Sequence, residues 1–203
     1  MSFNPQRTKV QLRLALNRLK LLQTRKLAVN ANLRQEIASL LQAHKEASAT
    51  IRVENVIRED NAVEALEVLE LFCELLLARF GLLESSKPAQ LDPRLSEAIS
   101  SLIWAAPRCE ARELLILRDL LAPKLGREGA IAAYENTDGV VHPRVVLKLS
   151  TEPPSSDLVQ AYLQEIASAY QVNWSADTDR KEKEKHQVSA SRKRERERCV
   201  FPH

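Results

Sequence analysis

The sequence contains very little of what interrupts a helix. It has four glycines in 203 residues, and neither glycine nor proline occurs between Pro5 and Gly81. Leucines recur through that stretch at steps of three, four and seven, a spacing that predicts two extended helices forming a hairpin. Aromatic residues make up only 4% of the chain, while leucine, alanine, glutamate and arginine are abundant. Such a composition is typical of an all-α protein.

Residues that would support catalysis or metal binding are also sparse and scattered. The four histidines do not combine with cysteines or carboxylates at metal-ligand spacing, and no GxSxG, HExxH or Walker motif occurs. The sequence therefore predicts a protein that is not an enzyme and uses no cofactor or metal. The three cysteines form no CxxC pair, which indicates a reducing compartment, and Cys73 lies on an apolar helix face where a buried thiol is expected.

No long apolar run is present. The most apolar segment extends from Val68 to Leu83, and Glu70, Glu74 and Arg79 interrupt it. It is too short and too charged to span a bilayer, and the chain does not open with a secretory leader. A cytoplasmic protein is therefore expected.

The charges that are present are unevenly distributed. Residues 1 to 45 carry nine basic side chains and one acidic side chain, a net charge of +8. Residues 1 to 174 are neutral overall, with 21 charges of each sign, so the remainder of that region carries −8. A subunit with this dipolar layout can pair its own helices, meet the opposite face of a neighbour, or hold an anionic surface with one side.

The first helix is expected to run from Pro5 into the mid-forties, because Asn4 is a suitable N-cap and proline suits the first helical position. At 100° per residue, one face collects the apolar side chains that belong in the core. Those residues are Leu12, Leu16, Leu19, Leu22, Leu33, Ile37 and Leu40.

Two leucines of this helix lie away from that face, among basic side chains. Leu14 and Leu21 are either singly exposed or packed under a later helix, or they belong to a contact surface for a partner subunit or a membrane. The residues of this candidate surface are Arg13, Leu14, Arg18, Lys20, Leu21 and Arg25.

The second helix is expected to begin near Thr50, after a turn at Ala47 to Ala49, and to end at Gly81 as the C′ residue. Its apolar arc covers half the helix or more, and Phe72 and Leu76 at the centre are expected to be deeply buried. An acidic stripe on the remaining side is either a solvated face or a site for a basic neighbour. The stripe consists of Glu64, Glu67, Glu70 and Glu74.

Shorter helices are expected after a linker at Glu84 to Leu91. Prolines, glycines and serines mark their ends. The expected helices are Asp92–Pro93 to Ala106, Arg108 to Leu121 with a kink or end at Pro123, a short one within Val140 to Leu149, and a last one from Ser155 or Ser156. A buried stripe on the last helix is expected from Leu158, Ala161, Tyr162, Ile166 and Tyr170. These elements predict one helical domain over residues 5–174 and a charged, disordered or solvated tail over 175–203.

Four runs of residues resemble the increased-sodium-tolerance family, a divergent branch of the ESCRT-III membrane-remodelling proteins. The similarity extends from about residue 6 to residue 174. The runs are RLALNRLKLLQTRK (Arg13 to Lys26), IRVENVIREDNAVEALEVLELFCELLLARFGL (Ile51 to Leu82), SLIWAAPR (Ser101 to Arg108) and YLQEIASAYQV (Tyr162 to Val172). The resemblance implies an ESCRT-III-like bundle in which shorter helices fold against a long antiparallel hairpin.

The resemblance also implies a function at endosomal membranes. A family member is expected to copolymerise with an ESCRT-III subunit of the charged multivesicular body protein type, and to regulate the vacuolar-sorting AAA ATPase that disassembles the filaments. It would be cytoplasmic and peripherally bound to endosomal membranes, where an anionic surface is a further partner. The run from Arg192 to His203 has no leucine-spaced amphipathic motif of the type that engages the ATPase, so direct contact with the ATPase is left open.

Nucleic-acid binding is the alternative function, through the basic first helix and the cluster from Arg192 to Arg198. Glu195 and Glu197 are interleaved with the bases of that cluster, and it contains no aromatic side chains for base stacking. No nucleic acid is therefore expected as a partner.

Overall fold

The computed structural model describes residues 3–137 and 139–174, and these residues form helices and loops without a strand. The prediction of an all-α protein is confirmed for this part of the chain. The helices are α1 (Pro5–Gln42), α2 (Glu46–Ala78), α3 (Phe80–Ser85), η1 (Pro88–Gln90), α4 (Pro93–Ala105), η2 (Ala106–Arg108), α5 (Arg112–Glu135), α6 (Pro143–Lys148) and α7 (Ser156–Ala169). The tail predicted at 175–203 lies outside the described residues.

Helix α1 begins where the local signals place it. The Asn4 side chain accepts a hydrogen bond from the backbone N–H of Arg7 at 3.0 Å, and the Thr8 hydroxyl donates to the Asn4 carbonyl at 2.7 Å. These bonds satisfy groups at the helix start that would otherwise lack partners. Of the predicted core face, Leu12, Leu19, Leu22 and Ile37 are buried, while Leu16, Leu33 and Leu40 are partly buried.

The prediction that α2 begins near Thr50 is wrong, because the turn lies earlier. His44 adopts a left-handed conformation with φ of 56°, and the N–H of Lys45 donates to the Leu40 carbonyl at 2.9 Å. A left-handed residue with such a bond ends a helix in the way that glycine usually does. The segment predicted as a turn, Ala47 to Ala49, consists of residues that a helix accepts, and it lies within α2.

Gly81 does not end α2, contrary to expectation. The helix stops at Ala78, Arg79 leaves the helical region, and Gly81 lies inside the short α3 that follows. Phe80 and Leu83 of α3 are buried. Phe80 and Leu83 follow the buried Leu76 by four and seven residues, so the core face of α2 continues into α3 across the break at Arg79.

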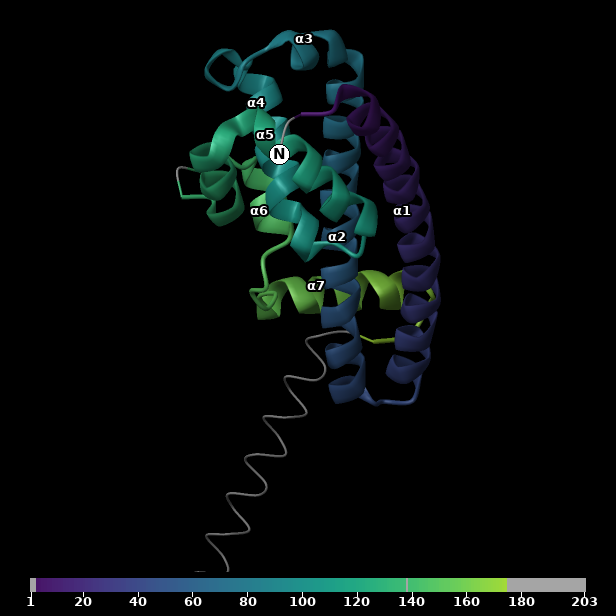
Figure 1. The fold of residues 1–203 in the computed structure, drawn as a ribbon. Helices are drawn as coiled ribbons and strands as arrows, with labels where there is room; N and C mark the ends of the chain where they lie inside the picture. Colours follow the sequence, from purple (N-terminus) through teal and green to yellow (C-terminus); the bar gives the residue numbers. More distant parts are fainter. Residues whose placement is uncertain (1–2, 138, 175–203) are drawn as a thin grey trace, which may run out of the picture. The chain divides into compact units, whose positions relative to one another are not determined.

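The chain divides into two compact units, the first comprising Met1–Ala31 and Ile57–Pro153. In this unit α1 and α2 run side by side in opposite directions, and α4, α5 and α6 cover one side of the pair (Figure 1). The core between them consists mainly of apolar side chains. Its large, fully buried side chains include Leu12, Leu19, Leu69, Leu76, Leu83, Leu95, Ile99, Leu102 and Ile103.

Leu76 is fully buried as predicted, but Phe72 is only partly buried. The Phe72 ring meets the His142 ring edge-on, with 5.6 Å between centroids. The backbone N–H of His142 donates to the Ser101 hydroxyl at 3.0 Å, which fixes the start of α6. Phe72 therefore lies at the margin of the core, against the loop before α6, instead of at its centre.

Helix α4 matches its predicted bounds, and Asp92 caps it by accepting from the N–H groups of Arg94 and Leu95. Helix α5 begins at Arg112 and not at Arg108, because η2 occupies the residues before it. Its direction changes at Gly126 (φ 74°, ψ 177°) and not at Pro123, since glycine alone adopts that conformation easily. The short helix predicted within 140–149 is present as α6.

The second unit comprises Asn32–Val56 and Pro154–His203, described here to residue 174. It holds the end of α1, the start of α2 and helix α7, which Ser155 caps by accepting from the Leu158 N–H at 3.3 Å. The stripe predicted on α7 is largely wrong. Leu158, Ala161 and Tyr170 are exposed and Tyr162 is partly buried. Ile166 is buried as predicted, and the rest of the buried face consists of Val159, Leu163 and Ala167.

Candidate interaction surface on the first helix

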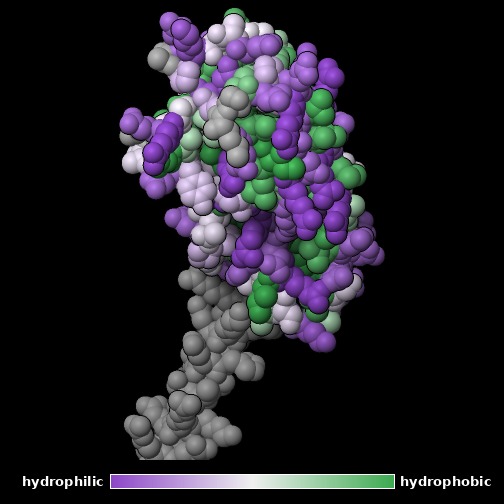
Figure 2. Space-filling model, in the orientation of Figure 1, coloured by the Kyte–Doolittle hydropathy of each residue, from purple (hydrophilic) through white to green (hydrophobic). Residues whose placement is uncertain are grey.

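The six predicted contact residues all lie on α1 within the first unit and form what we call the α1 face: Arg13, Leu14, Arg18, Lys20, Leu21 and Arg25. Leu14 is 51% exposed and Leu21 is 58% exposed. The alternative that these leucines pack under a later helix is therefore wrong for this structure. In Figure 2, hydrophobic side chains along the α1 side of the view alternate with hydrophilic ones, as the sequence spacing requires.

Two bases of the α1 face are held by carboxylates of the same chain. The Lys20 ammonium lies 3.3 Å from Glu70 and 3.4 Å from Glu74, and the hydrogen bonds that it donates to these carboxylates raise its pKa. Arg18 lies 3.8 Å from Glu113 of α5. The acidic stripe of α2 thus has a basic neighbour within the molecule. This favours its predicted role as a site for a basic neighbour over that of a solvated face.

The other two bases are open. Arg13 and Arg25 are exposed, and neither has an ion pair with any residue of the described structure. They flank Leu14 and Leu21, so the α1 face combines apolar contact area with positive charge. A surface of this kind suits a partner that presents carboxylates or phosphates around an apolar strip.

A second exposed leucine surface was not foreseen. Leu71 of α2 is 62% exposed, between the exposed carboxylates of Glu67 and Glu74, and we call this group, with Ala78, the α2 face. The signal was present in the sequence. Leu71 follows Glu67 by four residues and precedes Glu74 by three, which places it on the acidic side of the helix and off the core arc.

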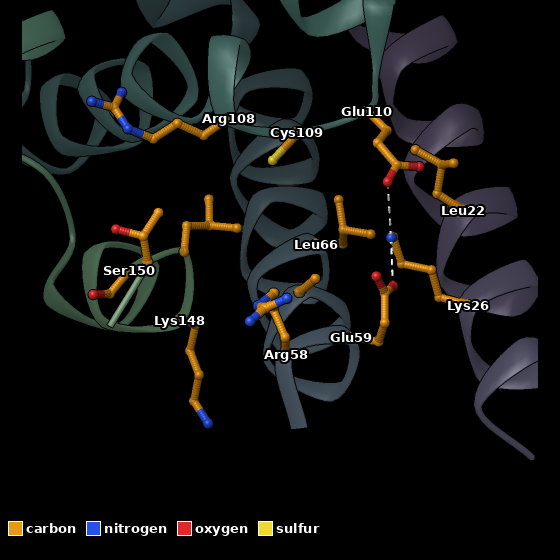
Figure 3. A pocket seen from close by; sticks show the side chains of 13 residues that line it. Leu22, Lys26, Arg58, Glu59, Leu66, Arg108, Cys109, Glu110, Lys148 and Ser150 are labelled. Atoms are coloured by element: carbon orange, nitrogen blue, oxygen red, sulfur yellow. Dashed lines mark hydrogen bonds and ion pairs between the residues drawn. The ribbon is translucent and has the colours of Figure 1, made fainter. Parts of the chain in front are cut away.

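A cavity of about 450 Å³ opens in the first unit between α1, α2, the loop after η2 and the end of α6. Figure 3 shows Leu66 and Cys109 on its inner wall, Lys26, Glu59 and Glu110 on one side, and Arg58 and Lys148 on the other. The Lys26 ammonium lies 2.7 Å from Glu59 and 3.3 Å from Glu110. Burial alone would lower the pKa of Lys26, but its bonds to these two carboxylates raise it.

The thiol in the wall of the cavity, that of Cys109, is not activated. Burial raises the pKa of Cys109 to about 12, with Glu110 adding to the shift and Lys26 and Arg108 opposing it. Burial likewise raises the pKa of Cys73 to about 12. Both thiols are therefore protonated at neutral pH, and a protonated thiol is a poor nucleophile and metal ligand.

Within residues 3–137 and 139–174, no group of three or more histidine, cysteine, aspartate or glutamate side chains is arranged to hold a metal ion. In the same part of the chain, no helix combines the length and the apolar character needed to cross a membrane.

Known proteins resemble this chain over most of its length. The family model described as Ist1, regulator of Vps4 activity in the MVB pathway, matches residues 9–173. The Saccharomyces cerevisiae vacuolar protein sorting-associated protein IST1 is 37% identical over 177 residues, covering 82% of this chain and 58% of its own length. The Dictyostelium discoideum IST1-like protein is 32% identical over 173 residues, covering 85% and 46% respectively. The chain thus spans about half the length of these relatives.

A solved structure agrees with the fold described above. The crystal structure of the S. cerevisiae Ist1 N-terminal domain, in complex with the Did2 MIM motif, matches with a TM-score of 0.79 and 35% sequence identity. The match covers 86% of this chain and 96% of that one. The expected ESCRT-III-like helical bundle is therefore confirmed.

Proposed function

Because this chain belongs to the Ist1 family, we propose that it is a non-enzymatic scaffold that copolymerises with an ESCRT-III subunit on endosomal membranes. The observation that carries the proposal is the structural match to the Ist1 N-terminal domain, which extends over nearly all of that domain. A helical bundle with exposed charged and apolar faces, and with a protonated thiol in its cavity, suits assembly better than catalysis.

We infer the class of partner from the same neighbour. The yeast domain was solved with the MIM motif of Did2. This chain would bind the corresponding motif of a Did2-like ESCRT-III subunit, and the resemblance implies a subunit of the charged multivesicular body protein type. Control over the Vps4-type AAA ATPase would follow from that contact, because the amount and arrangement of filament determine what the ATPase can disassemble.

The α1 face has a separate role in this proposal. Arg13 and Arg25 present open positive charge on either side of Leu14 and Leu21, so the face would meet an acidic surface of the partner subunit. Lys20 and Arg18 would contribute less, because Glu70, Glu74 and Glu113 already compensate their charges. An anionic membrane is the competing ligand for the same residues.

Cosedimentation of the whole chain with a Did2-like subunit, and separately with anionic liposomes, tests the proposal. Arg13→Glu with Arg25→Glu should weaken the interaction at the α1 face, and the wild-type interaction should decline as salt shortens the range of charge attraction. Arg94→Glu, an exposed arginine of α4, is the matched control. If the wild-type chain fails to sediment with the subunit under all conditions, the proposed function is wrong.

A further inference from the structure

Lys124 of α5 is a buried cation that joins three segments of the first unit, and only 6% of the residue is exposed. Its ammonium donates to the backbone carbonyls of Glu84 at 3.0 Å and Ser86 at 2.9 Å, where α3 ends. It also lies 4.2 Å from the centroid of the Phe3 ring, just before α1. An ammonium has three N–H donors, so two carbonyls and one aromatic face account for all of them.

The charge of Lys124 depends on these three partners. Within the part of the chain that the structure describes, no carboxylate forms an ion pair with it. Burial lowers the pKa of Lys124, and the charge of the Glu84 carboxylate only partly opposes the shift. Because a buried charge without partners is costly, the two carbonyls and the Phe3 ring together decide whether the ammonium stays buried.

The loop over residues 84–91, which we call the strap, has little else to hold it on α5. Leu91 is partly buried against the core, and Pro88 lies beside the bend of α5, where a Cβ atom on Gly126 would be 3.9 Å from the Pro88 Cβ. Among the described residues, the bonds from Lys124 are the hydrogen bonds that join the strap to α5. A segment with so few buried contacts opens more easily than the core. Its exposed residues are Glu84, Ser85, Lys87, Pro88 and Gln90.

Both ends of the strap are anchored independently of Lys124. Before it, Phe80 and Leu83 of α3 are buried in the core. After it, the Asp92 side chain caps α4 by accepting from the N–H groups of Arg94 at 2.9 Å and Leu95 at 3.4 Å. The strap can therefore leave α5 without unfolding the helix on either side.

We infer that Lys124 and Phe3 together hold the strap closed, and that the N-terminal end of the chain controls its opening. Phe3 precedes Asn4, whose side chain caps α1, so Phe3 can withdraw while α1 stays folded. Water then reaches the ammonium and competes with the carbonyls of Glu84 and Ser86, which weakens the hold on the strap. A change at the N-terminus is thereby transmitted to a loop that is distant in the sequence.

Opening changes what this end of the first unit presents to its surroundings. The start of α1, α3 and the strap lie at the same end of the unit (Figure 1). With the strap closed, the Lys124 ammonium is hidden, and with the strap open it faces water as an additional positive charge. The strap would operate whether or not the chain assembles with an ESCRT-III subunit.

Hydrogen exchange of the whole chain, measured by mass spectrometry, tests the inference. The N–H groups of Ser86 and Gln90 donate to the carbonyls of Leu82 and Lys87, so they are protected while the strap is closed. Phe3→Ala and Lys124→Met should each speed exchange over residues 84–91 at least about tenfold, because each removes a contact that keeps the strap closed. Exchange in α2 and α4 should stay as slow as in the wild-type chain.

Coupling between the two residues provides the sharpest arm of the experiment. Phe3→Ala should add little to the exchange of a chain that already carries Lys124→Met, because Phe3 acts through the ammonium. Phe3→Tyr keeps the aromatic face and should retain the slow exchange. The matched controls are Lys87→Met, at an exposed lysine of the strap, and Val10→Ala, at an exposed residue of α1, and both should leave exchange unchanged.

Proteolysis gives a second measurement of the same opening. A protease that cleaves after glutamate should cut next to the exposed Glu84 faster in Phe3→Ala than in the wild-type chain, with the fragments identified by mass spectrometry. Circular dichroism and thermal unfolding check that each variant folds. If Lys124→Met does not fold, the comparison of Phe3→Ala with Phe3→Tyr carries the test.

Several outcomes would overturn the inference. They are unprotected amides over residues 84–91 in the wild-type chain, exchange that Phe3→Ala leaves unchanged, exchange that rises equally in α4, or effects of Phe3→Ala and Lys124→Met that simply add. The third outcome would make Lys124 a brace for the whole unit, and the fourth would remove the link between the N-terminus and the strap. Failure of the chain to sediment with an ESCRT-III subunit would contradict the proposed function and leave the strap standing.

Discussion

The ammonium group of Lys26 joins α1 to α2 through Glu59 and to the start of α5 through Glu110. Only 13% of its side chain is exposed, so the two carboxylates would face each other without compensation if the charge were removed. Lys26→Met should lower the free energy of unfolding by about 1–2 kcal/mol, measured by urea denaturation. Lys20→Met, which removes a half-exposed ion pair, is the control and should lower the free energy of unfolding clearly less than Lys26→Met does.

The pH dependence of this loss follows from the direction of the pKa shift. The folded pKa of Lys26 lies above its ordinary value, so its contribution is complete below the ordinary pKa and disappears as pH rises through the folded pKa. The difference between wild type and Lys26→Met should therefore be constant around neutral pH and shrink only in the alkaline range. A difference that disappears near pH 7 would contradict this role for the Lys26 ammonium.

Burial separates the leucines of the core from those of the α1 face. Leu76→Ala should lower the free energy of unfolding by about 2–5 kcal/mol, because the side chain is fully buried. Phe72→Ala should cost less than the 3–5 kcal/mol typical of a fully buried phenylalanine, since its ring is only partly covered. Leu14→Ala and Leu21→Ala should each change the free energy of unfolding by about 0.5 kcal/mol or less. A large loss at Leu14 or Leu21 would show that the α1 face is buried in solution.

At the scale of elements, helices with local signals at their ends were predicted well. Asn4 and Pro5 mark the start of α1, and Asp92 and Pro93 mark the start of α4, because capping is a short-range interaction that the sequence states directly. Errors occur where tertiary packing decides. Arg79 is not a residue type that marks a helix end, yet α2 ends just before it and α3 begins just after it. The buried face of α7 was misplaced for the same reason.

The turn between α1 and α2 offers a test of why its position was missed. His44 has φ of 56°, a conformation that strains any residue with a Cβ atom. His44→Gly should raise the free energy of unfolding by about 0.5 kcal/mol, since the relief of strain exceeds the added freedom of the unfolded chain. The control Ala47→Gly, inside α2, should lower it by about 1 kcal/mol. A loss at His44→Gly as large as that at Ala47→Gly would contradict the assigned turn.

At the scale of the whole molecule, the charge asymmetry seen in the sequence becomes a spatial arrangement. The sequence placed Arg13, Leu14, Leu21 and Arg25 together correctly, since helical periodicity alone determines which residues share a face. It did not show that Lys20 forms an ion pair with Glu74 or that Arg18 forms one with Glu113. The partners in these two ion pairs are 54 and 95 positions apart in the sequence.

The acidic residues of α2 next to Lys20 lead to a prediction that separates a scaffold from a nucleic-acid-binding protein. Glu74, which lies 3.4 Å from Lys20, and the exposed Glu67 of α2 should repel a phosphate backbone, so residues 1–174 should bind DNA and RNA weakly at physiological salt while still binding an ESCRT-III subunit. Fluorescence anisotropy with labelled oligonucleotides, and cosedimentation with the subunit, measure the two affinities for the whole chain and for a chain lacking Ser175–His203. Glu67→Lys with Glu74→Lys should strengthen nucleic-acid binding, because it removes the repulsion and leaves the α1 face intact. Tight oligonucleotide binding that survives deletion of the tail in the unsubstituted chain would instead support the nucleic-acid function.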